Sequence, residues 1–155
     1  MHLFCNIMAM LYKSLLMLLV SLSACSVSQF NPLQTDQNFI TIGSGGGFSG
    51  IETQYHIVET GQVYKQVGLD SDLTHLKPVK EGTIKQALRN CQQFELLDYQ
   101  YQNPGNTYEF LTIHHGSRSN RIVWGGKSLK EVRPVCTQIY GLLHGIIINA
   151  ENAKN

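Results

Sequence analysis

The feature that most constrains the fold is an alternation of apolar and polar residues along residues 51–57, which read IETQYHI. Successive side chains of a β-strand point to opposite faces of the sheet, so this period of two predicts a strand with one buried face. Runs rich in β-branched and aromatic residues at 39–42, 63–67, 107–115 and 120–124 predict four further strands. The chain is therefore expected to build a sheet of about five strands.

Two amphipathic segments predict helices. The first covers residues 81–97, and the second follows residue 128, where Ser128 and Glu131 have capping-box spacing. Pro134 fits poorly inside a helix, so we expect a broken first turn or a start near Arg133. The order βββαββα predicts an α+β domain over residues 39–150, with an antiparallel sheet and both helices on one face.

A glycine-rich segment, GSGGGFSG at 43–50, is expected to be a loop between the first two strands. Glycine permits positive φ angles and leaves backbone amides accessible, so the segment is a candidate for contact with a partner. Phe48 within it is either an exposed anchor or a lid buried at the sheet edge, as in a wide hairpin loop. The candidate partner-binding residues are Ser44, Gly45, Gly46, Gly47, Phe48, Ser49 and Gly50.

The N-terminal part has the pattern of an export signal. An apolar run over 14–22 follows Lys13, and it is too short to span a bilayer, which takes about 20 residues. The following residues, Leu22-Ser23-Ala24-Cys25, match the lipobox of bacterial lipoproteins, with small side chains beside the cleavage site and a thiol to receive the lipid. Residues 1–24 are thus predicted to be a signal peptide, with lipidation of Cys25. The absence of Lys and Arg before Lys13 suggests that Met10, and not Met1, is the true start.

The residues after the predicted cleavage site suggest how the domain is held. Residues 25–38 are predicted to be the lipidated N-terminus and a flexible tether, and residues 151–155 a disordered tail. The protein is expected in the cell envelope, bound to the bilayer through acylated Cys25. Ser26 is not the aspartate that retains many lipoproteins at the inner membrane, which favours the outer membrane.

The balance of charges along the chain bears on whether nucleic acid can be a partner. The chain has 12 Lys and Arg, of which Lys13 is lost with the signal peptide, and the remaining 11 balance 11 Asp and Glu. Without a basic surplus there is little to neutralise phosphates, so nucleic acid is not an expected partner.

Two glycine-containing segments resemble nucleotide-binding loops without meeting their requirements. Gly125-Gly126-Lys127-Ser128 lacks the earlier glycine of a phosphate-binding loop, since Arg121 occupies that position. The segment 43–50 has Phe48 where a dinucleotide-binding loop has its last glycine, and a strand is predicted to follow it. We interpret the first as a turn with a helix cap and expect no cofactor.

The remaining chemistry-bearing residues favour a protein without catalysis. His114 and His115 are adjacent on a predicted strand, so they point to opposite faces and cannot chelate one ion together. His56, His75 and His144 have no ligand spacing, and we expect no metal. No nucleophile elbow is present. An enzyme is therefore not expected, although catalytic groups that meet only in space would escape this argument.

Two features of the predicted helices leave alternatives open. Cys91 and Cys136 lie one in each helix, so they form either a disulfide or two buried free thiols. Gly141 and Gly145 have GxxxG spacing, but the helix is amphipathic, so we interpret them as sites of close helix–sheet packing.

Most of the mature chain resembles small uncharacterised bacterial lipoproteins that share a G-S-G-G-G-F-[ST]-G motif, a P-G-N turn before an aromatic strand, and a strand ending in Trp-Gly. Segment 44–51, SGGGFSGI, also resembles the S-G-G-F-x-G-I motif of emfourin-like inhibitors of thermolysin-type metalloproteases, with one extra glycine. Emfourins usually lack a leader, so the lipobox departs from that pattern. The residues carrying the first resemblance are Gly43 to Gly50, Pro104-Gly105-Asn106, Tyr108, Phe110 and Trp124-Gly125.

These observations predict a lipid-anchored binding module without catalytic activity. Its expected partner, beyond the bilayer, is an envelope or secreted protein. Inhibition of a metalloprotease is the sharper alternative, implied by the emfourin resemblance, and an envelope enzyme is the third possibility.

Overall fold

The computed structural model describes residues 30–32, 35–68 and 72–152, without the side chains at 127 and 128. The chain divides into two compact units, Met1–Asn31 and Pro32–Asn155. The first unit lies almost wholly outside the described residues, and so do the predicted signal peptide and Cys25. The second unit is the folded domain, and all that follows concerns it.

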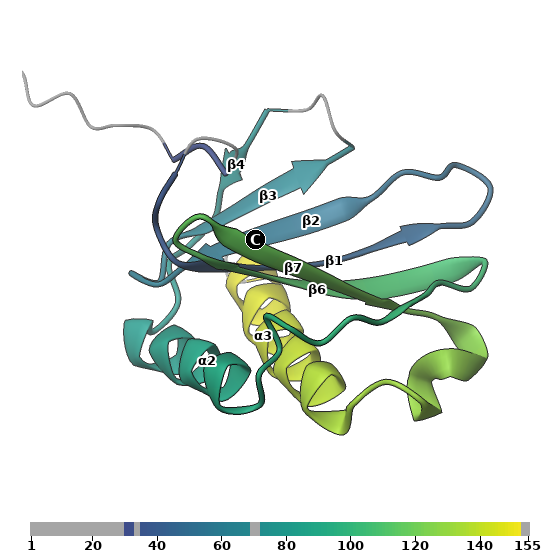
Figure 1. Cartoon of the computed structure of the whole chain (residues 1–155). Helices are drawn as coiled ribbons and strands as arrows, with labels where there is room; N and C mark the ends of the chain where they lie inside the picture. Colours follow the sequence, from purple (N-terminus) through teal and green to yellow (C-terminus); the bar gives the residue numbers. More distant parts are fainter. Residues whose placement is uncertain (1–29, 33–34, 69–71, 153–155) are drawn as a thin grey trace, which may run out of the picture. The chain divides into compact units, whose positions relative to one another are not determined.

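The domain is a seven-stranded sheet with two α-helices on one of its faces (Figure 1). The strand order is β4-β3-β2-β1-β6-β7-β5, and every pair is antiparallel except β5 and β7. The class is thus α+β, as the sequence predicts. The elements are β1 (Phe39–Gly46), β2 (Thr53–Val58), β3 (Val63–Val67), β4 (Thr74–His75), α2 (Glu81–Gln93), β5 (Gln102–Asn103), β6 (Thr107–His115), β7 (Arg118–Trp124), the 3-10 helix η1 (Gly126–Lys130) and α3 (Pro134–Asn152).

The core lies between the sheet and the helices. Alternate residues of the central strands point toward the helices, such as Ile40 and Ile42 of β1 and Leu111 and Ile113 of β6, and all four are at most 1% exposed. The helices contribute side chains at three- and four-residue spacing, the pattern of an amphipathic helix. These are Ile84, Ala87, Leu88 and Cys91 of α2 and Cys136, Ile139, Tyr140, Leu143 and Ile147 of α3.

The face of the sheet away from the helices is also largely buried, because its own side chains cover one another. The Phe39 ring stacks on the His114 ring with centroids 3.8 Å apart, and the Arg121 guanidinium lies 3.8 Å from the centre of the Phe110 ring. Thr41 Oγ1 and His56 Nδ1 are 2.9 Å apart, at hydrogen-bonding distance. Contacts among aromatic and polar side chains therefore shield much of this face from solvent.

Three sequence predictions about the sheet need correction. It has seven strands and not about five, and it is mixed, because β5 pairs parallel with β7. The strand predicted at 39–42 continues to Gly46, since this glycine-rich stretch pairs with β6 as far as Gly46↔Thr107. The order βββαββα becomes ββββαβββα. By contrast, β3 and β6 have the bounds predicted from the sequence.

The second helix starts at Pro134, which confirms the alternative of a start near Arg133, but its N-terminal cap differs from the prediction. Residues 126–130 form η1, so the spacing of Ser128 and Glu131 does not cap α3, which begins at Pro134. Proline suits the first helical position because its missing N–H would have no intrahelical partner there. At the other end α3 runs to Asn152, two residues past the predicted end of the domain, and Lys65 Nζ lies 3.0 Å from Glu151 Oε1.

Gly141 and Gly145 do not pack on the sheet, which corrects the interpretation of their spacing. Both are exposed on α3, and a Cβ added at either would find no atom within 4 Å. The buried stripe of α3 lies on another side of the helix and includes Tyr140, Leu143 and Ile147.

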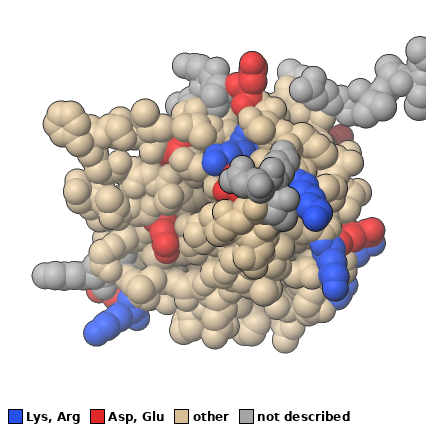
Figure 2. Space-filling model, turned by 180° about the vertical axis from the view of Figure 1, so that it is seen from behind, with Lys and Arg blue, Asp and Glu red and all other residues tan. Residues whose placement is uncertain are grey.

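The surface carries no field of one sign on the face shown in Figure 2. Basic and acidic side chains there are few, and they stand singly or in mixed groups on a mostly uncharged surface. This agrees with the balance of 11 basic and 11 acidic residues after Lys13.

Candidate functional site: the β1–β2 hairpin and the cleft beside it

The β1–β2 hairpin projects at one end of the sheet (Figure 1), and glycines shape its tip. Gly46, Gly47 and Gly50 have φ angles of 91°, 70° and 62°, in the region that side chains with a Cβ rarely adopt. The Gly47 N–H donates a hydrogen bond to the Asn106 carbonyl oxygen at 2.7 Å, which ties the tip to the turn before β6. This bond holds the start of the tip, and glycine lets the chain adopt the positive φ angles there without strain.

Phe48 is fully exposed at this tip. Of the two alternatives left by the sequence, the buried lid is therefore wrong, and Phe48 is an exposed side chain. Ile51, three residues further on, is also more than half exposed. Burial of a phenylalanine side chain would stabilise the fold by roughly 1.5–3 kcal/mol, and the exposed Phe48 does not make this contribution. Its position therefore favours a role outside the folding of the domain.

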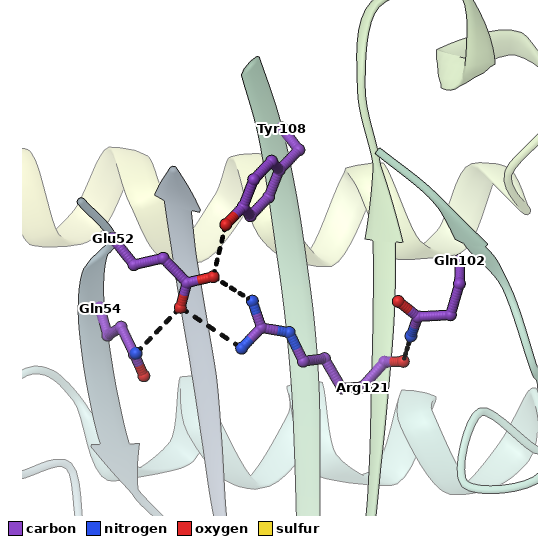
Figure 3. A network of polar contacts seen from close by, with 5 residues as sticks. All are labelled: Glu52, Gln54, Gln102, Tyr108 and Arg121. Atoms are coloured by element: carbon purple, nitrogen blue, oxygen red, sulfur yellow. Dashed lines mark hydrogen bonds and ion pairs between the residues drawn. The ribbon is translucent and has the colours of Figure 1, made fainter. Parts of the chain in front are cut away.

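A polar network on the face away from the helices braces the base of the hairpin (Figure 3). Its centre is the Glu52 carboxylate, which accepts a hydrogen bond from Tyr108 Oη at 2.7 Å and from Gln54 Nε2 at 3.1 Å. Arg121 Nη2 forms an ion pair with Glu52 Oε1 at 2.6 Å. The Arg121 carbonyl oxygen in turn accepts a hydrogen bond from Gln102 Nε2. One carboxylate thereby links β2, β6 and β7 across the sheet.

Two glycines of the GSGGGFSG segment leave the space that the side chains of Phe110, Glu52 and Tyr108 occupy. A Cβ at Gly43 would clash with the Phe110 ring and the Thr53 carbonyl oxygen. A Cβ at Gly45 would lie 2.8 Å from Glu52 Cγ and 2.9 Å from Tyr108 Oη. The glycines at 43 and 45 are therefore needed for packing within the sheet, whereas those at 46, 47 and 50 are needed for the backbone of the tip.

On the helix-facing side, the base of the same hairpin borders a cleft of about 500 Å³, which we call the end cleft. Its walls come from the ends of β1, β6 and β7 and from η1, and two of its residues, Ile51 and Leu129, are more than half exposed. It is lined by Ser44, Gly45, Gly46, Ile51, Thr53, Thr107, Tyr108, Glu109, Trp124, Gly125, Gly126 and Leu129.

One carboxylate lines the end cleft. Glu109 of β6 lies opposite Trp124 of β7 in the sheet register, and Trp124 Nε1 donates a hydrogen bond to Glu109 Oε2 at 2.9 Å. The Trp124 ring is 1% exposed and meets the Tyr140 ring edge-on, with centroids 5.6 Å apart. Burial and the nearby Glu109 charge raise the pKa of the Tyr140 hydroxyl, so it stays protonated.

The predicted partner-binding residues therefore separate into two groups. Ser44, Gly45 and Gly46 belong to β1 and line the end cleft, while residues 47–50 form the tip. Both groups belong to one hairpin, so the structure brings the predicted segment together with the cleft.

Cys91 and Cys136 are both buried and both carry free thiols. Burial raises the pKa of Cys91 to about 12 and that of Cys136 to about 11, which makes both thiols poor nucleophiles. They belong to the core beneath the sheet, away from the hairpin tip.

The histidines are spread over the domain. His56 and His114 belong to the covered face of the sheet, His75 to β4, and His144 stacks on Tyr140 of α3. Within residues 30–152, as far as they are described, no three His, Cys, Asp or Glu side chains are grouped so that they could hold a metal ion.

Sequence reasoning missed the charged residues of this site. Glu52 and Arg121 are 69 positions apart, and only the register of β2, β1, β6 and β7 brings them together. Glu109 left a local signal, because it shares the period-two positions of Leu111 and Ile113 in the strand. A carboxylate on the apolar side of a strand marks a polar site or a cleft.

Comparison with models of known protein families finds none that matches the chain. Comparison with curated proteins finds no significantly similar sequence.

No helix among the described residues has both the length and the apolar character needed to cross a membrane.

Proposed function

We propose that the protein is a lipid-anchored binding module without catalytic activity, which holds a partner protein through the β1–β2 hairpin. The observation that carries the proposal is the full exposure of Phe48 on a tip whose positive φ angles glycine permits and which the bond from Gly47 to Asn106 ties to the turn before β6. Aromatic side chains on preorganised loops supply much of the binding energy at protein interfaces. The exposed Ile51 and Leu129 extend the apolar surface toward the end cleft.

The anchor in this proposal is the lipobox cysteine, Cys25, which lies outside the described residues. Lipid on Cys25 and a tether up to residue 38 would hold the domain at the cell envelope, at the outer membrane in preference to the inner. The even balance of charges in the mature chain supports attachment by lipid and not by surface charge.

The state of the Glu52 carboxylate and of the two buried thiols supports a role without catalysis. Both oxygens of Glu52 accept hydrogen bonds from Arg121, and Tyr108 and Gln54 add one each. A carboxylate saturated in this way serves to hold strands together and is a poor general base. The thiols of Cys91 and Cys136 are buried and protonated, so they are unsuited to attack a substrate.

Replacing Phe48 tests the proposal. Phe48→Ala should weaken binding of the partner from envelope extracts by about 2 kcal/mol or more, about thirtyfold, because the anchor side chain is lost. The free energy of unfolding should change by less than about 0.5 kcal/mol, since the side chain has no packing to lose. Phe94→Ala, at an aromatic that is half exposed at the end of α2, is the matched control and should leave binding unchanged. Equal binding by Phe48→Ala and the wild type would reject the hairpin tip as the site.

The second candidate is inhibition of a thermolysin-type metalloprotease. It rests on the resemblance of SGGGFSGI to the emfourin motif, and the projection of this segment as a hairpin tip favours it (Figure 1). The protein should then inhibit such a protease at stoichiometric concentration without being cut, and Phe48→Ala should abolish inhibition. A folded protein that inhibits none of several such proteases would leave only the general binding module.

A further inference from the structure

Glu109 is a partly buried carboxylate in the wall of the end cleft. It lies on the helix-facing side of β6, at the same two-residue spacing as the buried Leu111 and Ile113. A carboxylate among apolar neighbours needs a cationic partner or water, because transfer from water is unfavourable. The Trp124 indole donates a 2.9 Å hydrogen bond to Glu109 Oε2, and this neutral donor does not compensate the negative charge.

A second charged residue on the same side of the sheet, Lys65, has an ion-pair partner among the described residues, unlike Glu109. Lys65 of β3 also points toward the helices, and there Glu151 of α3 pairs with it at 3.0 Å. Among the described side chains, no Lys or Arg forms an ion pair with Glu109. Within the described part of the chain, the charge of Lys65 thus has an ion-pair partner and the charge of Glu109 has none.

The end cleft has the size and lining to receive a long cationic side chain. Its volume of about 500 Å³ falls within the range of small ligand sites, about 300–1,000 Å³. Ile51 and Leu129 offer apolar surface for a methylene stem, and Gly45 and Gly46 leave the β1 wall without bulk.

We infer that the end cleft binds a Lys or Arg side chain of the partner protein, whose cationic head pairs with the Glu109 carboxylate. The inference rests on the proposed function and adds its chemistry: the partner presents a basic residue beside the apolar surface that meets Phe48. The carboxylate supplies charge and hydrogen-bond acceptors, and the Trp124 indole fixes its orientation.

The test uses the only tryptophan of the chain as its reporter. The full chain, labelled with ¹⁵N-tryptophan and held in nonionic detergent micelles, gives one indole N–H signal in NMR, from Trp124. Nα-acetyl-arginine N-methylamide and its lysine analogue should shift this signal saturably. The neutral citrulline analogue has almost the shape of the arginine probe, and it should bind at least tenfold more weakly.

Two variants test whether binding of the arginine probe depends on the Glu109 carboxylate. Glu109→Gln keeps an acceptor for the indole and removes the charge, so the affinity for the arginine probe should fall at least tenfold. Glu81→Gln, which removes an exposed carboxylate on α2, should leave the affinity unchanged. Equal affinity for arginine and citrulline probes on the wild type overturns the inference, and this arm decides even if Glu109→Gln does not fold.

The outcome also separates this inference from the proposed function. Phe48 is not among the cleft residues, so Phe48→Ala should leave probe binding unchanged. Loss of partner binding in Phe48→Ala, combined with no preference for the arginine probe, would retain the binding module and reject the cationic side chain. Charge-selective probe binding at Glu109, combined with full partner binding by Phe48→Ala, would support the cleft site and reject the hairpin tip.

Discussion

At the scale of single residues, the glycines of one motif have different physical roles. Gly43 provides the space in which the Phe110 ring crosses β1, and the Arg121 guanidinium then lies on that ring. Gly50 has no atom within 4 Å of an added Cβ, but its φ of 62° favours glycine. The same residue type therefore serves packing at one position and backbone conformation at another.

The packing role predicts a loss of stability in Gly43→Ala. The added methyl group would clash with Phe110 and the Thr53 carbonyl, so the free energy of unfolding should fall by about 1–3 kcal/mol in urea denaturation. Gly82→Ala in α2 is the control, because open space surrounds it and alanine favours the helix by up to about 1 kcal/mol. A Gly43→Ala protein as stable as the wild type would show that this glycine is not needed for packing.

At the scale of elements, the sequence predicts those strands that are long enough to carry a local pattern of their own. β3 and β6 were predicted with their observed bounds, because strands of five to nine residues carry a recognisable run. β4 and β5 were missed, since two residues have no period and form strands only by pairing with a neighbour. The glycine-rich end of β1 was assigned to a loop, because its pairing with β6 depends on Phe110 and Tyr108, which lie more than 60 residues away.

The same limit applies to the site. Exposure of Phe48 was one of two alternatives that the sequence left open, and the structure decided between them. The Glu52–Arg121 pair follows from a strand order that places β1 and β6 between the two residues, which no local pattern contains.

The exposed glycines of α3 give a prediction at this scale. Gly141→Ala and Gly145→Ala should each raise the free energy of unfolding by up to about 1 kcal/mol, because alanine reduces the entropy lost on helix formation and meets no neighbour. Thermal unfolding of the two single variants and the double variant measures the effect. A lower melting temperature in either single variant would indicate a tight contact at that glycine.

At the scale of the whole molecule, the covered face of the sheet should make stability depend on pH. Burial, with a smaller effect of the His56 charge, lowers the pKa of His114 to about 4. In the unfolded chain the pKa returns to about 6.5, so between these values the unfolded state binds more protons. The contribution of neutral His114 is therefore complete above pH 6.5 and is lost as the pH falls toward 4. The pKa of His56 is also lowered by burial and acts in the same direction.

His114→Phe should remove the His114 contribution to this dependence, leave that of His56, and keep the stacking on Phe39. Urea denaturation at pH 6.5 and pH 4 should show that the free energy of unfolding falls by about 1–2 kcal/mol more in the wild type than in the variant. This value is smaller than the full pKa shift would give, because water reaches part of the His114 ring. His115→Gln, at the exposed neighbouring position, should behave as the wild type. Identical losses in His114→Phe and the wild type would contradict the assignment of a low pKa to His114.

The short outer strands of the sheet have a consequence for how these molecules meet one another. At one side the chain just after β4 is bonded to β3, with the Leu76 N–H donating to the Val63 carbonyl oxygen at 2.9 Å. At the other side the Val123 N–H donates to the Tyr101 carbonyl oxygen at 3.0 Å, and Asn120 Nδ2 donates to the Leu96 carbonyl oxygen at 2.7 Å. In the lipid-anchored state that we propose, the domain would meet its neighbours in two dimensions, where crowding promotes the pairing of open sheet edges. Because the strands at both margins of the described sheet, β4 and β5, are only two residues long, neither margin offers a long open edge for pairing between copies.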